Sequence, residues 1–228
     1  MEALVINLAS RPDRWERVRE QCASAGVTPI RVEAVPFESV AEEDWRRFWH
    51  RAKLQQSMGF MDMVPNPERT VAATLACLRS HVACLERVVD GGPQLVLEDD
   101  VQLAPDFLEG MARSVRDGDE FGIDWAAVVG GGYHRIAPVV LTEHTSAARR
   151  VRNAHSVWWS RQGAADYLRL LRREALPADV QWDALAVRGR LLCTRSQVSW
   201  QEAGQSDIFG KKMTSRFFGG RDVKHRWR

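Results

Sequence analysis

One stretch of this chain, residues 95–101, passes from three apolar residues directly into three acids and has the sequence LVLEDDV. A short apolar run that follows Gly91, Gly92 and Pro93 is typical of a buried strand. Strands of this kind belong to sheets covered on both faces, and open α/β sheets bind their ligands at the carboxyl ends of such strands. The stretch therefore predicts an α/β fold with a functional site where this strand ends.

The three acids at this strand end are candidates for holding a cation. In an extended backbone Glu98 and Asp100 point to the same side, and carboxylates packed together repel one another unless a cation or hydrogen-bond donors compensate their charge. A hard divalent cation suits such oxygen ligands, and it would clamp a diphosphate and neutralise it as a leaving group. The residues alone leave a second interpretation open, in which 98–100 form a solvated acidic turn.

The composition indicates one globular domain of ordinary size. The chain has 228 residues, of which 45% are hydrophobic, and this is enough for a sizeable core. Its 32 basic and 30 acidic residues nearly cancel, which argues against a nucleic-acid partner. The four cysteines form no CxxC pair, so neither a zinc site nor a disulfide framework is predicted.

The sequence also bears on location and source. It has no signal-like N-terminus and no apolar run of about 18 residues, so we expect a cytoplasmic protein without a membrane span. Its basic residues are mostly arginine, which suits a GC-rich bacterial genome or a role in phosphate binding.

The N-terminal part has the pattern of a βαβ unit. Residues 3–8 and 27–35 read as buried strands, and the residues between them follow helical spacing. A strand, a helix and a strand at these distances predict a parallel sheet. Arg11 and Arg14 lie beside the helix start, which favours an anion such as a nucleotide phosphate, although both side chains can equally be solvated.

Residues 36–70 interrupt the βα pattern and predict a helical and loop insertion. Ser39 and Glu42 match a capping box for an amphipathic helix. Residues 58–65 are apolar and irregular, which indicates either a mobile flap or a loop packed on the core.

Downstream of the insertion, helical and strand patterns alternate again. Residues 74–90 carry one apolar stripe at helical spacing, and 124–129, 155–160 and 191–199 read as strands. Three glycines, 130–132, follow one of these strands and either admit a ligand close to the backbone or form a turn. No repeat or second-domain boundary appears, so we expect a single domain over the whole chain.

Six short motifs occur in order along the chain, and together they resemble glycosyltransferase family 25, the lipopolysaccharide-type galactosyltransferases related to collagen galactosyltransferases. The motifs are 6–8 with Arg11, Asp13 and Arg14; 77–81; 97–100; 163–164; Asp183; and 206–208. The resemblance spans about residues 4 to 208. It implies a GT-A-like, Rossmann-type α/β fold with a mostly parallel sheet flanked by helices, in one glycosyltransferase domain over 1–228.

The resemblance also implies a reaction and a set of site residues. Its donor is a nucleotide sugar, usually UDP-galactose or a close relative, and the sugar is transferred with inversion. Glu98 and Asp100 become the expected ligands of Mn²⁺ or Mg²⁺, with His225 as a further candidate. The implied donor-binding residues are Asn7, Leu8, Arg11, Arg14, Ser80, His81, Asp99 and Gly131.

Inversion in a single step needs one general base and no enzyme nucleophile. Asp183 is the predicted base, because it matches the acid that the family places before a helix. Trp182, Ser206 and Asp207 are expected on the acceptor side, where Trp182 would stack on a sugar. The alternatives are that Asp183 caps the following helix and that Trp182 belongs to the core.

Two departures from the family pattern leave another function class open. Ala73 and Thr74 stand where the family often has Gly-Glu, and residues 36–70 match poorly. The alternative is a non-catalytic sugar-nucleotide or peptide-binding relative. A nucleotidyltransferase is disfavoured, because its Gly-rich phosphate loop near the N-terminus is absent. The acceptor stays open among a lipid-linked glycan, a protein or peptide side chain and a small natural product.

The C-terminal tail, residues 211–228, is basic, with seven Lys or Arg residues against one acid, Asp222. One interpretation is a solvated terminus. A second is a lid that hinges at residues 219–220 and closes over UDP, and a third is peripheral contact with an anionic membrane.

Overall fold

The computed structural model describes residues 1–55, 66–92, 94–202, 204–209 and 211–213. Its helices are α1 (Pro12–Ser24), η1 (Phe37–Ser39), α2 (Glu42–Leu54), α3 (Pro67–Val89), α4 (Phe107–Glu120), α5 (Arg161–Leu171), α6 (Ala178–Gln181) and α7 (Asp183–Ala186). Its strands are β1 (Glu2–Asn7), β2 (Thr28–Glu33), β3 (Leu95–Glu98), β4 (Val101–Leu103), β5 (Ala127–Val129), β6 (Tyr133–Ile136), β7 (Val139–Val140), β8 (Thr145–Ala147), β9 (Arg150–Arg152), β10 (Ser156–Trp159), β11 (Leu191–Thr194), β12 (Ser199–Gln201), β13 (Gly204–Ser206) and β14 (Lys211–Met213).

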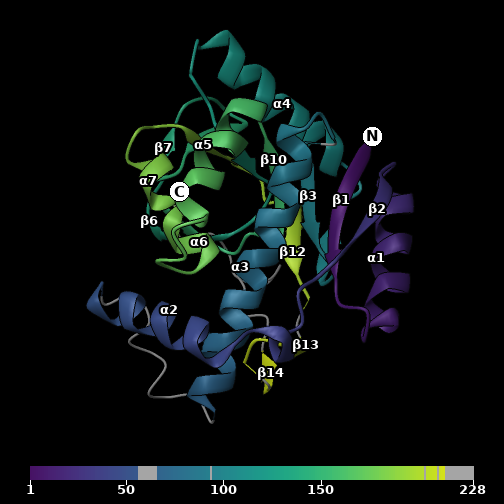
Figure 1. The fold of residues 1–228 in the computed structure, drawn as a ribbon. Coiled ribbons are helices and arrows are strands. Elements are labelled where there is room, and N and C mark those ends of the chain that lie inside the picture. The colour runs from purple at the N-terminus through teal and green to yellow at the C-terminus, as the bar shows by residue number, and fades with distance from the viewer. Residues whose placement is uncertain (56–65, 93, 203, 210, 214–228) are drawn as a thin grey trace.

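An eight-stranded sheet with the order β2-β1-β3-β10-β5-β11-β8-β7 forms the middle layer (Figure 1). Parallel pairing joins β1 to β2, β1 to β3 and β5 to β11. β10 and β8 are each antiparallel to both of their neighbours, so these two strands run against the other six. The sheet is thus mixed but mostly parallel in direction, which confirms the predicted Rossmann-type α/β class.

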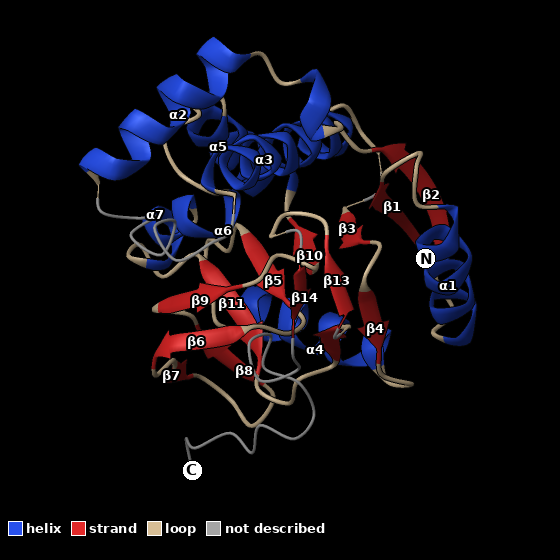
Figure 2. Ribbon diagram, turned by 90° about the horizontal axis from the view of Figure 1, so that it is seen from below, coloured by secondary structure: helices blue, strands red, loops and turns tan. Residues whose placement is uncertain are grey.

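Helices cover both faces of this sheet (Figure 2). One core, which includes Phe48, Leu75 and Leu78, lies under α2, α3 and α5. The other core, which includes Val18 and Phe107, lies under α1 and α4. Burial on both faces explains why the central strands read as continuous apolar runs in the sequence.

The predicted N-terminal βαβ unit is confirmed. β1 and β2 pair in parallel over six residues each, and α1 begins with Pro12, whose fixed φ suits a first helical turn. Gly26 follows the helix with φ 70°, a conformation that favours glycine. The unit brings the helix start, with Arg11 and Arg14, beside the carboxyl end of β1.

The structure differs in two details from the helical insertion that the sequence predicts. The capping box is wrong: Ala41, not Ser39, precedes α2, and the Ser39 hydroxyl donates to the Pro36 carbonyl at 2.7 Å. α3 begins at Pro67 rather than near residue 74, because the Asn66 side chain caps it by accepting from the Arg69 amide at 3.0 Å. The flap predicted at 58–65 lies outside the described residues.

The stretch 191–199, predicted as one strand, forms parts of two. β11 pairs with β5 in the main sheet, whereas β12 pairs with β4 in a small sheet of its own. This second pairing brings the β12 segment to the acidic turn after β3. Of the helices that the structure describes, none combines the length and apolar composition needed to cross a bilayer.

Candidate functional site

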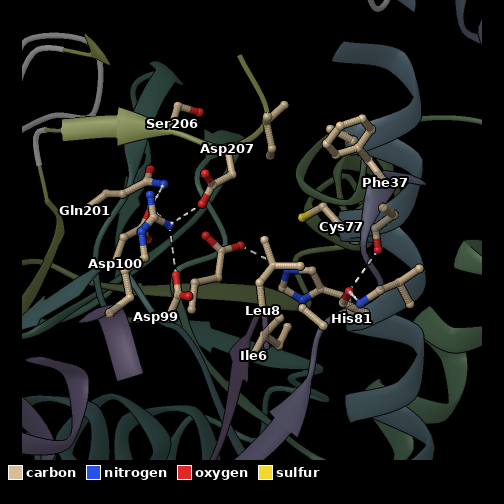
Figure 3. A pocket seen from close by; sticks show the side chains of 18 residues that line it. Ile6, Leu8, Phe37, Cys77, His81, Asp99, Asp100, Gln201, Ser206 and Asp207 are labelled. Atoms are coloured by element: carbon tan, nitrogen blue, oxygen red, sulfur yellow. Dashed lines mark hydrogen bonds and ion pairs between the residues drawn. The ribbon is translucent and has the colours of Figure 1, made fainter. Parts of the chain in front are cut away.

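A pocket opens at the carboxyl ends of the neighbouring strands β1 and β3. The chain adds β2 on one side of β1 and β3 on the other, and open α/β sheets bind ligands at such a switch point, beyond the carboxyl ends of the strands. The pocket has a volume of ≈ 120 Å³ (Figure 3). Its polar lining consists of Arg14, Cys77, Ser80, His81, Glu98, Asp99, Asp100, Gln201, Ser206 and Asp207.

Asp99 ties the acidic turn to the first βα unit. Its carboxylate accepts hydrogen bonds from the Asn7 amide at 2.7 Å and from the Arg14 guanidinium at 3.0 Å. Burial raises the pKa of Asp99, and Arg14 opposes that rise. Asn7 also donates to the Arg11 carbonyl at 3.0 Å. Because these groups already satisfy Asp99, its position fixes the loop after β1 rather than offering a free carboxylate.

Glu98 faces the opposite helix layer and contacts His81. The His81 Nε2 lies 3.0 Å from the Glu98 Oε1. Burial by itself would raise the pKa of Glu98, but the contact with His81 outweighs it and holds this pKa below its ordinary value. The Glu98 amide donates to the His155 carbonyl at 2.9 Å, so the reversed strand β10 also fixes this end of β3.

Asp100 is the acid whose charge is least compensated. Its Oδ2 accepts from the Gln201 amide at 2.9 Å, whereas its buried Oδ1 has no hydrogen-bond partner within the described part of the chain. Burial, followed by the charges of Glu98 and Asp99, raises the pKa of Asp100 to about 7. An orphaned oxygen and a raised pKa in a cluster of three acids are the physical signs of a site that lacks positive charge.

Arg11 and Arg14, predicted to bind a phosphate, hold a carboxylate instead. The Asp207 Oδ2 lies 2.7 Å from the Arg11 Nη1 and 3.3 Å from the Arg14 Nη1. Ser206 and Asp207, expected on the acceptor side, therefore lie beside the residues predicted to bind the donor (Figure 3). The segment that contains Asp207 therefore covers Arg11 and Arg14, the candidate phosphate-binding residues.

Among the other predicted donor residues, Leu8 contributes apolar lining and Ser80 has a structural role. The Ser80 hydroxyl accepts from the Val35 amide at 2.9 Å and donates to the Ala76 carbonyl at 2.9 Å. Ser80 is buried, and these two bonds join α3 to the segment after β2. It shapes the wall of the pocket.

Gly131 lies away from this pocket, on a second cavity of ≈ 280 Å³ lined also by His134 and Arg195. A Cβ at Gly131 would come within 2.0 Å of the Ser199 carbonyl oxygen. The glycine is required because β12 packs directly on this backbone, so the structure gives it no part in the pocket at the acidic turn.

The sequence interpretation of Trp182 as a sugar platform is wrong. Trp182 is 0% exposed, and its indole N–H donates to the Val151 carbonyl at 2.9 Å. A side chain without exposed surface cannot stack on an acceptor. Trp182 belongs to the core, which was the alternative that the sequence left open.

Asp183 lies outside the lining of the acidic pocket and is held by two arginines. Its oxygens accept from the Arg152 guanidinium at 2.8 and 2.9 Å and from the Arg150 Nε at 3.2 Å. Its side chain is 25% exposed. No side-chain cap bond marks the start of α7, so helix capping does not explain this acid. His225 lies outside the described residues.

The sequence did not single out two residues that lie in or near the site. Asp179 lies four residues before Asp183, and its side chain accepts a hydrogen bond from the Asn153 backbone N–H at 3.2 Å. Burial raises the pKa of Asp179, and the charge of Glu98 raises it further. Cys77 lines the pocket one helical turn before His81. The i, i+4 spacing of Cys77 and His81 was the available signal, because it places both side chains on one face of a helix.

Comparison with protein families gives a match over the N-terminal part of the chain. The family model described as "Glycosyltransferase family 25 (LPS biosynthesis protein)" matches residues 1–128. This region contains β1, α1, α3 and β3, and hence the arginines, His81 and all three acids of the turn. The Gln201 and Asp207 side of the pocket lies beyond the match. No curated protein matches the chain.

Proposed function

Since this chain belongs to glycosyltransferase family 25, it is a glycosyltransferase, and we propose that it moves a hexose, galactose or glucose, from a UDP-sugar to an acceptor hydroxyl. We further propose that transfer inverts the anomeric carbon and depends on Mn²⁺ or Mg²⁺. The observation that carries the finer proposal is the Asp100 carboxylate at the switch point of the sheet, because its buried Oδ1 has no hydrogen-bond partner among the described residues and its pKa is raised.

Asp100 and Glu98 fit a hard cation by the chemistry of their donor atoms. The unpartnered Oδ1 of Asp100 offers an oxygen ligand, and the neighbouring negative charges favour a dication. When bound, Mn²⁺ or Mg²⁺ supplies positive charge to a departing diphosphate. Asp99 would act differently, because its bonds to Asn7 and Arg14 keep the helix start in place.

The two arginines would bind the diphosphate after exchanging their present partner. The pocket volume of ≈ 120 Å³ is smaller than the roughly 300–1,000 Å³ typical of ligand sites. Donor binding therefore requires residues 206–208 to move outward. Arg11 and Arg14 would then replace the Asp207 carboxylate with phosphate oxygens, which are partners of the same charge and hydrogen-bonding type.

We assign the removal of the acceptor proton to Asp183. Its carboxylate is partly exposed and is oriented by Arg150 and Arg152, and a base held in one orientation is suited to proton transfer. Asp179 is the acid to compare with it, because it lies one helical turn away and its pKa is raised by burial.

A panel of UDP-sugars tests the proposed reaction. The protein is incubated with each donor and Mn²⁺, and released UDP is measured with water or an added sugar as the acceptor. We expect slow release from UDP-galactose or UDP-glucose that EDTA stops, and NMR of the released sugar should show the opposite anomeric configuration. UDP binding without any release from the panel would instead support a non-catalytic sugar-nucleotide-binding relative.

A further inference from the structure

Three side chains of different chemistry meet on the α3 side of the acidic pocket. Cys77 and His81 project from successive turns of α3 (Figure 3). Glu98 reaches them from the end of β3. One potential ligand atom from each residue lies within 4.8 Å of the other two. All three side chains line the pocket, so a small ion can reach them from solvent.

We propose that Cys77, His81 and Glu98 form a binding site for a borderline divalent cation of the Zn²⁺ class. A thiolate, an imidazole and a carboxylate are the ligand types that Zn²⁺ takes, and three protein ligands leave a fourth position open toward the pocket. A thiolate and a carboxylate also balance the charge of a dication. This site goes beyond glycosyl transfer, because a thiolate and an imidazole are not the ligands that a hard Mn²⁺ or Mg²⁺ ion prefers.

The spacing of the three ligand atoms can be compared with that of a tetrahedral site. Metal–ligand bonds of roughly 2.0–2.3 Å place the ligand atoms about 3.3–3.7 Å apart. The His81 Nε2 and the Glu98 Oε1 are 3.0 Å apart, and the Cys77 sulfur lies within 4.8 Å of both. A small rotation of the side chains closes the set around an ion. The metal then replaces the His81–Glu98 hydrogen bond, and the thiol proton leaves to solvent as the thiolate binds.

The other cysteines do not offer such a site. All four cysteines lie in the described part of the chain, and Cys22, Cys84 and Cys193 are buried whereas Cys77 is partly exposed. The sequence predicts no zinc site, because its four cysteines form no CxxC pair. Here two ligands come from helical i, i+4 spacing and the third from a strand that only the fold brings near.

The consequence for catalysis rests on the proposed function. Glu98 belongs both to this set and to the proposed hard-cation site, so one carboxylate would serve two ions of different chemistry. Zn²⁺ held by Cys77 and His81 would draw Glu98 toward α3. We expect this to weaken the binding of the Mn²⁺–UDP complex, which makes Zn²⁺ an inhibitor of this site.

Cobalt titration of the metal-free protein tests the site directly. Co²⁺ substitutes for Zn²⁺, and a Co²⁺–thiolate bond gives a charge-transfer absorption that oxygen ligands do not give. We expect this band to saturate at one ion per chain and to disappear when Zn²⁺ is added. Cys77→Ala should lose the band, whereas Cys84→Ala, which alters a buried cysteine of the same helix, should retain it.

Two further measurements complete the test. In competition with a chromophoric chelator, Cys77→Ala should bind Zn²⁺ on the order of 100-fold more weakly than wild type, because losing even an outer-shell partner costs roughly 10–100-fold. Zn²⁺ should also raise the melting temperature of the wild type and of Cys84→Ala but not of Cys77→Ala. The last result shows that the variant is folded yet lacks the site.

The proposal is overturned if saturating Co²⁺ gives no thiolate band or if Cys77→Ala binds Zn²⁺ as the wild type does. Neither titration contains a nucleotide sugar. Their failure therefore leaves the proposed glycosyl transfer standing, and an absence of transfer leaves the metal titrations interpretable.

Discussion

The Asp207 carboxylate lies 2.7 Å from the Arg11 guanidinium, although 196 residues separate the two in sequence. The pair joins a C-terminal segment to the start of α1. It also places a negative group where the sequence predicts a phosphate. The protein thus supplies its own anion to the arginines, and a nucleotide must compete with it.

Asp207→Asn is expected to strengthen UDP binding. The substitution removes the competing charge but keeps the size of the side chain. A pair of this exposure contributes roughly 0.2–1 kcal/mol, so we expect an increase of about 1.4- to fivefold in affinity by calorimetry with Mn²⁺ present.

Glu202→Gln is the matched control for Asp207→Asn. It removes a nearby carboxylate whose partner is Arg17, outside the pocket, and its UDP affinity should equal that of the wild type. Weaker UDP binding in Asp207→Asn would show that this acid supports the donor rather than competing with it.

UDP affinity is expected to depend on a divalent cation and on Asp100. Calorimetry with Mn²⁺ should show binding that EDTA weakens strongly and that Asp100→Ala lacks, because the cation offsets the repulsion between diphosphate and the acidic turn. Asp106→Ala, which removes an exposed acid just after β4, should behave as wild type. Equal affinities in Mn²⁺, in EDTA and in Asp100→Ala would rule out the proposed cation role.

Asp100→Asn is expected to become more stable than the wild type as pH rises. Without a cation the pKa of Asp100 is about 7, whereas an unfolded Asp titrates near ~3.9. Between these values the folded wild type retains a proton that the unfolded chain releases, so wild-type stability falls with rising pH. Urea unfolding should show the gap between variant and wild type widening by roughly 1–3 kcal/mol from about pH 4 to about pH 8.

Mn²⁺ should narrow this gap at the higher pH, because it binds the folded wild type through the ionised Asp100. Asp106→Asn should show no gap that varies with pH. A difference between Asp100→Asn and wild type that stays constant across the pH range would mean that Asp100 has an ordinary pKa.

Asp183→Asn is expected to lower turnover on the order of 10²–10⁴-fold. A general base acts in the transition state, so UDP affinity should change little while kcat falls. Asp179→Asn is the comparison variant and should retain more turnover than Asp183→Asn. If Asp179→Asn is the more impaired of the two, with both variants folded by circular dichroism, the base is Asp179.

Much of the fold was predictable because it depends on local pattern. The apolar run before Glu98, the βαβ unit and the α3 stripe each follow from the period of buried positions, and the structure contains all of them. The reversal of β10 was not predictable, because an apolar strand pattern is the same in either direction. The Ser39 capping box failed because Ser39 ends η1 and the chain is extended at Val40 and Ala41 before α2 begins.

The acids of the site were predictable from the sequence, but the residues that contact the site residues were not. The end of a parallel strand marks where ligands bind, which was sufficient to single out Glu98 and Asp100. The contacts of Asp207 with Arg11 and of Cys77 with Glu98 depend on tertiary packing between distant segments. For Trp182, the sequence could not separate a buried aromatic from an exposed one.

The alignment of β3 with β1 has a consequence for insertions and deletions. Ile6 is paired with Glu98 in this register. Glu98, the last residue of β3, contacts His81, whereas Asp99, in the turn that follows, binds Arg14. Because strand side chains alternate with a period of two, one residue added within β3 would move each following residue of the strand to the opposite face. Leu97 would then face His81 and Glu98 would take the place of Asp99 beside Arg14, so the length of β3 determines which residue each helix layer receives.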